Sequence, residues 1–149
     1  EFGELPLIQC YAGQLNQVFM NIVSNAIDAL ADVRNRKLEL AGAADAQRPN
    51  CPSLPLGCEG LPSIRIRTEV LENNRVAIAI SDNGPGMSES VKSRIFDPFF
   101  TTKPVGKGTG LGLSISYQIV VERHGGTLRC TDAPGGGTEF AIEIPIRQR

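Results

Sequence analysis

The clearest periodic pattern of the chain runs from Gln14 to about Val33 and predicts an amphipathic helix. Its apolar positions recur at the spacing of a stripe that faces a core; they are Leu15, Val18, Phe19, Ile22, Val23, Ala26, Ile27 and Leu30. At about 100° per residue, Asn21, Asn25 and Asp28 fall together on another side of this helix. That polar side is either a solvated face or a ligand site, and periodicity alone favours the solvated face.

Shorter alternating segments predict two strand pairs, at residues 63–70 and 75–80 and at residues 127–131 and 138–144. A tight turn at 72–74 and a glycine-rich turn at 132–137 join the members of each pair. Between the pairs, the pattern predicts a short helix over 88–95 with Ser88 as its N-cap, and a longer helix from Leu113 to Arg123. We expect the longer helix to end at His124-Gly125-Gly126, with a glycine in the left-handed conformation. This order predicts an α+β fold, a two-layer sandwich in which helices cover one face of a mixed, mostly antiparallel sheet.

The length of 149 residues fits one domain over residues 1–149. Within it, residues 34–62 change character and contain several prolines, so we expect an irregular surface connection there. Residues 5–10 predict a short edge strand, where Pro6 is tolerated. The first residues, Glu1-Phe2-Gly3, resemble a cut end, and we expect a fragment of a longer protein.

The net charge, the apolar runs and the cysteine pattern argue against nucleic-acid binding, a membrane-spanning helix and a zinc or disulfide framework. A net charge of −1 gives no general attraction to nucleic acid or to an anionic membrane surface. No apolar run reaches the length of a transmembrane helix. The cysteines are Cys10, Cys51, Cys58 and Cys130, and they form no C-x-x-C pair, which favours free thiols in a reducing compartment over a zinc site or disulfides.

Glycines at alternate positions of Lys107-Gly-Thr-Gly-Leu-Gly-Leu113 leave a backbone that no side chain blocks. Such a loop can bring several N–H groups close to a phosphate, and the first turn of the helix that follows adds its own free N–H groups and dipole. Glycine-rich turns before helices also occur without a ligand, so the loop alone leaves both interpretations open. It is not a Walker loop, which requires Gly-x-x-x-x-Gly-Lys-Ser/Thr.

A second candidate site is Ser81-Asp-Asn-Gly-Pro-Gly-Met87, directly after a predicted strand. Asp82 can accept a hydrogen bond from an exocyclic amine such as adenine N6. Gly84 and Gly86 would let the backbone approach a flat ring, and Met87 offers an apolar wall. The alternative is a turn without a ligand, because these residues are also the standard turn formers.

The segment Phe96-Asp-Pro-Phe-Phe-Thr-Thr-Lys103 lies between the two candidate sites. Its phenylalanines are interpreted as a small apolar cluster that fixes a loop. Lys103 and Lys107 are either cations that neutralise phosphate or solvated loop lysines.

Four segments described above resemble, in this order, four sequence motifs of the catalytic ATP-binding domain of sensor histidine kinases. These kinases belong to the GHKL group, which includes gyrase B, Hsp90 and MutL. Residues 21–26 resemble the N box, 82–87 the G1 box, 96–100 the F box and 108–113 the G2 box. His124-Gly-Gly and Gly137-Thr-Glu-Phe140 are similar to the closing strands of the family. The resemblance covers nearly the whole chain except residues 34–62. Asn25-Ala-Ile-Asp-Ala-Leu and Phe-Phe-Thr-Thr-Lys are most similar to the NtrB-type kinases with a short ATP lid.

The resemblance implies a Bergerat-type ATP-binding fold and assigns roles to individual residues. Asn25 matches the Mg²⁺ ligand, Asp82 the residue that recognises the adenine amine, and Thr138 a position near adenine. Asn21, Lys103 and Lys107 would lie beside the phosphates and are the candidate catalytic residues. The complete set expected around the nucleotide is Asn21, Asn25, Asp28, Asp82, Gly84, Gly86, Met87, Phe99, Thr101, Thr102, Lys103, Gly108, Thr109, Gly110, Leu111, Gly112, Leu113 and Thr138.

The implied activity is transfer of the γ-phosphoryl group of Mg-ATP to a histidine of a separate dimerisation and phosphoacceptor domain, upstream of a response regulator. His124, the only histidine, is interpreted as structural, so the acceptor domain would precede residue 1. The alternative is a nucleotide-binding module or ATPase without histidine kinase activity. The ATPase relatives carry a glutamate base where this chain has Asn21, which favours the kinase. We expect a cytoplasmic domain, monomeric in isolation, that contacts neither nucleic acid nor membrane, although its parent protein can be membrane-anchored.

Overall fold

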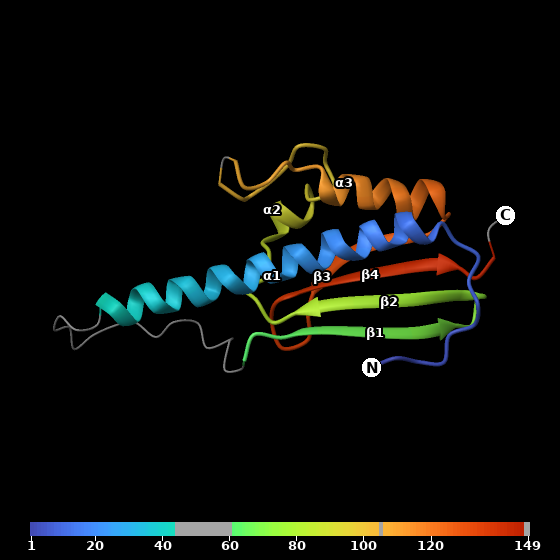
Figure 1. Cartoon of the computed structure of the whole chain (residues 1–149), viewed down its shortest axis with the longest axis horizontal. Coiled ribbons are helices and arrows are strands. Elements are labelled where there is room, and N and C mark those ends of the chain that lie inside the picture. Colours follow the sequence, from blue (N-terminus) through green and yellow to red (C-terminus); the bar gives the residue numbers. More distant parts are fainter. Residues whose placement is uncertain (44–60, 105, 148–149) are drawn as a thin grey trace.

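The computed structural model describes residues 1–43, 61–104 and 106–147, which form two strand hairpins and a set of helices (Figure 1). In chain order the elements are α1 (Ala12–Ala43), β1 (Ile64–Leu71), β2 (Arg75–Asp82), α2 (Glu89–Lys92), α3 (Gly112–Tyr117), the π-helical turn η1 (Gln118–Arg123), β3 (Thr127–Asp132) and β4 (Thr138–Pro145). Helix α3 continues into η1 without a break.

The four strands form one sheet in the order β1-β2-β4-β3, and each neighbouring pair is antiparallel. Helices α1 and α3 lie on the same side of this sheet (Figure 1). The predicted two-layer α+β sandwich is therefore confirmed. In the part of the chain that the structure describes, parallel pairing is limited to one isolated bridge between Phe2 and Thr68.

The core lies between the sheet and α1. Strand register brings Ile142 opposite Ile78 and Leu128, so these side chains share the face that α1 covers. From α1, Val18 and Ile22 contribute side chains with 0% exposure. Each such burial contributes about 1.5–3 kcal/mol relative to an exposed side chain. This packing fixes the rotation of α1 about its axis.

Two details of α1 differ from the prediction. The helix runs to Ala43 and does not end near Val33, so the expected irregular connection is wrong for residues 34–43. Arginine, lysine, leucine, glutamate and alanine in that stretch are good helix formers, and the first proline comes only at Pro49. The rest of the expected connection, residues 44–60, lies outside the described residues. Ile27 is 54% exposed and does not belong to the core stripe. Its neighbour Ala26, on the adjacent side of the helix, is the residue that the core buries.

Two further local predictions also need correction. Residues 5–10 form no strand; the chain there is held by one backbone bond, from Gln9 N–H to Ile146 O at 2.9 Å, and Ile8 packs against the core. Ser88 does precede α2, but its side chain makes no capping hydrogen bond. Instead Lys92 of α2 binds Glu89 and Asp132, at 2.9–3.0 Å to the latter, and these two carboxylates raise the pKa of Lys92. Helix α2 is thus fixed to β3 by charge.

His124 joins the end of η1 to the start of α1. Its ring is 1% exposed; Nδ1 lies 2.7 Å from Ile119 O, and Tyr11 N–H donates to Nε2 at 3.1 Å. Because a backbone N–H can only donate, Nε2 accepts and Nδ1 carries the proton that Ile119 O accepts. The imidazole is therefore neutral, in a single tautomer. The next residue, Gly125, has φ +58°, which confirms the predicted left-handed helix end.

Replacing His124 with phenylalanine should lower the free energy of unfolding by about 1–3 kcal/mol, because a buried N–H and a buried C=O lose their partners. Urea unfolding followed by circular dichroism measures this. Tyr11→Phe is the control, since it keeps the backbone N–H and an aromatic ring next to His124. Equal stability of His124→Phe and the wild type would refute the structural role of this histidine.

The two described cysteines, Cys10 and Cys130, are free, as predicted; Cys51 and Cys58 lie outside the described residues. Burial raises the pKa of the Cys130 thiol to about 11, so it stays protonated at neutral pH. Among the described helices, none combines the length and the apolar composition that crossing a membrane requires.

Candidate nucleotide site

A cavity of about 470 Å³ opens beside α1 and is closed by the end of β2, by α2 and by the loop that leads into α3. All four sequence blocks contribute to its wall. The predicted site residues that line it are Asn25, Asp28, Asp82, Gly86, Met87, Thr101, Thr102, Lys103, Lys107, Gly108, Thr109, Gly110, Gly112, Leu113 and Thr138.

Four predicted site residues do not line the cavity: Asn21, Gly84, Phe99 and Leu111. Asn21 faces α3, where its Nδ2 donates to Gly112 O at 3.0 Å and to Ser116 Oγ at 3.1 Å. It therefore fastens the end of the glycine loop to α1. Phe99 is 74% exposed and has φ +67°. It points away from the core, against the interpretation that all phenylalanines of its segment form an apolar cluster.

The apolar cluster does include the neighbours of Phe99. Phe96 packs against Tyr117 with 5.3 Å between ring centroids, and Phe100 lines the cavity with the Arg94 guanidinium 4.5 Å from its ring centroid. The segment is thus anchored on both sides of its exposed residue.

Several lining residues were not predicted: Ala26, Ala29, Asp32, Pro85, Val91, Ile95, Phe100, Pro104 and Phe140. Some of them carried a signal in the sequence. Asp32 stands one helical turn beyond Asp28, on the same side of α1. Val91 and Ile95 are four residues apart in the predicted short helix, which places them on one face. Phe140 is two residues beyond Thr138 in a strand, and therefore on the same face.

Asp82 marks the buried end of the cavity. It is the last residue of β2, its exposure is 7%, and its Oδ1 accepts a hydrogen bond from Gly84 N–H at 2.8 Å. No second hydrogen bond to this carboxylate occurs within the described part of the chain. Thr138, which is 6% exposed, lines the same cavity. The arrangement offers a buried acceptor and a hydroxyl to a flat polar ring held between apolar walls.

The charged end of the cavity is formed by α1 and the loop that carries Lys103. The Lys103 ammonium lies 3.0 Å from Asn25 Oδ1 and 2.5 Å from Asp28 Oδ2. Lys107 is exposed and has no ion pair within the described residues. The cavity thus contains one lysine that is already paired with α1 and one that is exposed.

The glycine loop lies against the phenylalanine segment. Phe99 N–H donates to Gly110 O at 2.8 Å, and Gly110 has φ +66°. At the start of α3, Leu111 makes no side-chain capping bond, so the first N–H groups of the helix have no side-chain acceptor there. Uncapped helical N–H groups next to a side-chain-free loop suit a phosphate.

The residues at Asn25 also fit a divalent cation. Lys103 shows that the oxygens of Asn25 and Asp28 jointly attract positive charge at this place. No cluster of three or more histidine, cysteine or acidic residues exists in the described ranges. An amide oxygen and a carboxylate oxygen are hard donors that suit Mg²⁺, which keeps several waters and takes most other ligands from substrate phosphates.

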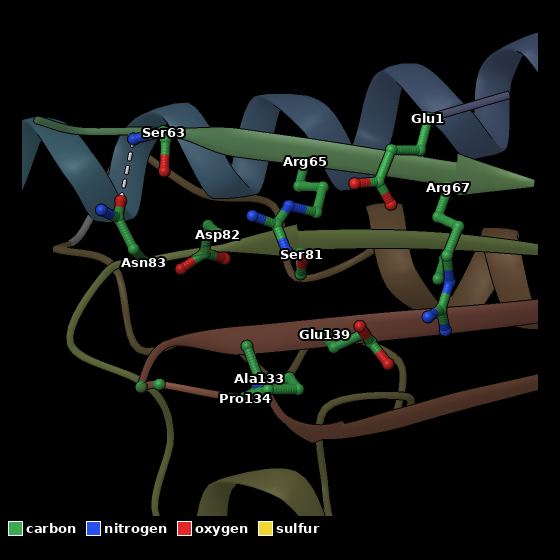
Figure 2. Close-up of a pocket in the computed structure, with 13 residues that line it drawn as sticks. Glu1, Ser63, Arg65, Arg67, Ser81, Asp82, Asn83, Ala133, Pro134 and Glu139 are labelled. Carbon is green, nitrogen blue, oxygen red and sulfur yellow. Dashed lines mark hydrogen bonds between the residues drawn. The ribbon is translucent and has the colours of Figure 1, made fainter.

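A second cavity, of about 210 Å³, lies on the sheet face that the helices leave open. Figure 2 shows acidic and basic side chains together there, with Arg65 and Arg67 on β1 and Glu139 on β4. It contains neither the glycine loop nor Asn25. The glycine loop and Asn25 both line the larger cavity, so we assign the nucleotide site to the larger cavity.

A family model described as "Histidine kinase-, DNA gyrase B-, and HSP90-like ATPase" matches residues 11–148 of the chain. Sporulation kinase E of Bacillus subtilis (strain 168) is 34% identical over 145 residues, which are 97% of this chain and 15% of that protein. The chain therefore corresponds to a small part of this relative.

Solved structures show the same fold. The catalytic domain of the histidine kinase ThkA aligns with a TM-score of 0.67 and 29% identity, over 98% of this chain and 76% of that chain. In a second structure, ThkA is in complex with the response regulator protein TrrA; there the TM-score is 0.65 and the identity 26%, over 98% of this chain and 33% of that chain.

Proposed function

Since the chain belongs to the family of histidine kinase-, DNA gyrase B- and HSP90-like ATPases, we propose that it is the catalytic domain of a sensor histidine kinase. It binds ATP with Mg²⁺ and transfers the γ-phosphoryl group to a histidine of a separate dimerisation and phosphoacceptor domain. The observation that carries the proposal is that the two ends of the larger cavity differ. A buried carboxylate lies at one end, and an amide, a lysine and a glycine loop lie at the other.

The buried end suits adenine. Asp82 Oδ1 is engaged by Gly84 N–H, which leaves acceptor capacity on the carboxylate for the exocyclic amine. Thr138 offers a hydroxyl nearby, and Met87, Ile95 and Phe140 supply apolar walls for the ring.

The charged end suits the triphosphate. The glycine loop and the start of α3 present backbone N–H groups, Lys103 and Lys107 add positive charge, and Asn25 would hold Mg²⁺. Held there, Mg²⁺ would help to neutralise the charge that develops on the transferred group. The protein contributes position and electrostatic stabilisation, which is most of what phosphoryl transfer requires.

Transfer is favoured over hydrolysis because this chain has no carboxylate at the position from which the ATPase relatives activate water. The position that carries a base in ATPase relatives is Asn21, whose amide donates to Gly112 O and Ser116 Oγ. Asp28 is held by Lys103. The acceptor would be a neutral histidine imidazole, which is nucleophilic without a base. By analogy with the ThkA–TrrA complex, a response regulator would follow in the pathway.

Asn25→Ala should abolish the Mg²⁺ dependence of nucleotide binding and transfer to a supplied phosphoacceptor domain, because it removes the proposed metal ligand. Calorimetric titration with a non-hydrolysable ATP analogue, with and without Mg²⁺, measures the first effect. Asn16→Ala is the matched control, since Asn16 is an exposed asparagine of the same helix outside the cavity. A folded wild type that does not bind the analogue, or an Asn25→Ala protein that keeps the full Mg²⁺ effect, would contradict the proposal.

A further inference from the structure

Lys103 fastens the loop that carries it to α1. Lys103 Nζ binds two oxygens, Asn25 Oδ1 at 3.0 Å and Asp28 Oδ2 at 2.5 Å. The two acceptors are three residues apart on α1, so they share one side of the helix. The Lys103 side chain is 32% exposed and that of Asp28 is 52% exposed, so the pair lies at the mouth of the cavity.

Asp28 is unsuited to contact the nucleotide directly. A carboxylate repels a triphosphate, yet Asp28 lines the cavity where the phosphates would lie. Its contact with Lys103 offsets that charge. Asp28 and the phosphates therefore compete for the same ammonium group.

Asn25 has a similar conflict. Its Oδ1 accepts a hydrogen bond from Lys103, and the same oxygen is the proposed ligand of Mg²⁺. An ammonium group and a divalent cation repel each other and cannot both occupy one amide oxygen. The contact seen here and a loaded site therefore exclude each other at this atom.

We infer that Asp28 is a positioning residue that holds Lys103 on the metal-ligating oxygen of Asn25, and that nucleotide binding displaces Lys103 from Asp28 to the phosphates. The inference rests on the proposed function. Lys103 acts as an internal counter-ion of the site before it acts on the substrate. Its flexible four-carbon stem allows this change without movement of α1.

Lys107, the second lysine of the cavity, differs from Lys103 in its contacts. Lys107 lines the same cavity but is exposed, and it makes no ion pair with any described residue. Only Lys103 is held by α1, so removal of Asp28 changes the availability of one lysine and not of both.

The test is a binding cycle with Asp28→Asn, Lys103→Gln and the double variant, titrated calorimetrically with a non-hydrolysable Mg-ATP analogue. Asp28→Asn should bind about two- to fivefold more tightly than the wild type, as expected when one partly exposed ion pair no longer has to be broken. In the Lys103→Gln background the same substitution should tighten binding less, because it then relieves only the repulsion between Asp28 and the phosphates and no ion pair has to be broken. Asp32→Asn is the matched control, because it removes the same charge from the same helix without breaking an ion pair.

Thermal unfolding gives an independent readout. The two substitutions should be non-additive in the protein without nucleotide, and additive when the analogue saturates the site. Weaker binding by Asp28→Asn, or equal tightening in both backgrounds, would overturn the inference while the proposed function stands. A folded wild type that binds no analogue would overturn both.

Discussion

Asp82→Asn is expected to weaken binding of an ATP analogue by about 10- to 150-fold, which corresponds to the loss of a hydrogen bond to a charged group, about 1.5–3 kcal/mol. The substitution conserves size, so the buried residue leaves no gap. It replaces one acceptor oxygen by an NH₂ group. Oδ1 already accepts from Gly84 N–H, so an asparagine that keeps this bond presents its NH₂ group to the adenine amine, donor against donor.

Calorimetric titration with ATP and GTP analogues checks this prediction. The wild type should prefer the adenine nucleotide, and the variant should lose that preference as well as affinity. Asp97→Asn is a suitable control, since Asp97 has a 59% exposed side chain outside the cavity. Unchanged affinity and preference in a folded Asp82→Asn protein would show that adenine is bound elsewhere.

Gly110→Ala is expected to lower nucleotide affinity by at least about 30-fold, because it separates the glycine loop from the phenylalanine segment. A Cβ at Gly110 would lie 2.4 Å from the carbonyl carbon of Phe99 and 2.6 Å from its oxygen. The φ of +66° adds strain for any residue with a side chain. The hydrogen bond from Phe99 N–H to Gly110 O cannot persist with that overlap.

Gly106→Ala separates the two causes. Gly106 also has a positive φ, +87°, but a Cβ there would meet none of the described residues within 4 Å. It should therefore show the cost of backbone strain without the collision, and keep most of the affinity. Calorimetry, with unfolding curves for both variants, compares them. Equal affinities of the two variants would show that contact between the two loops is not needed for binding.

The fold was largely predictable because it depends on patterns that are local in the sequence. The stripe of α1 and the alternation in the strands determine which face each element buries, and the turns at 72–74 and 132–137 determine the hairpins. Errors occurred where the local signal was weak. Residues 34–43 contain no proline and continue α1, and Ile27 fits the helical period but is exposed.

The residues that line the proposed site were largely predictable, but their contacts were not. The four boxes meet at one cavity, yet no pattern indicates that Asn21 donates to Gly112 O or that Phe99 is exposed. The pairing of Lys103 with Asp28 joins residues 75 positions apart and depends on the path of a loop without helix or strand. Such contacts follow from tertiary packing and have no period in the sequence.

The middle of the sheet joins distant parts of the chain, and this has a consequence for folding. Each hairpin closes locally, whereas the ladder between β2 and β4 pairs Ile78 with Ile142 and must close a long loop. Strand pairing between distant segments forms slowly, so the pairing of β2 with β4 is expected to form after both hairpins. Asp82 is the last residue of β2, and Thr138 is the first residue of β4. A growing chain can therefore form the proposed adenine pocket only after β4 has emerged, and the ability to bind nucleotide would report that β4 has joined the sheet.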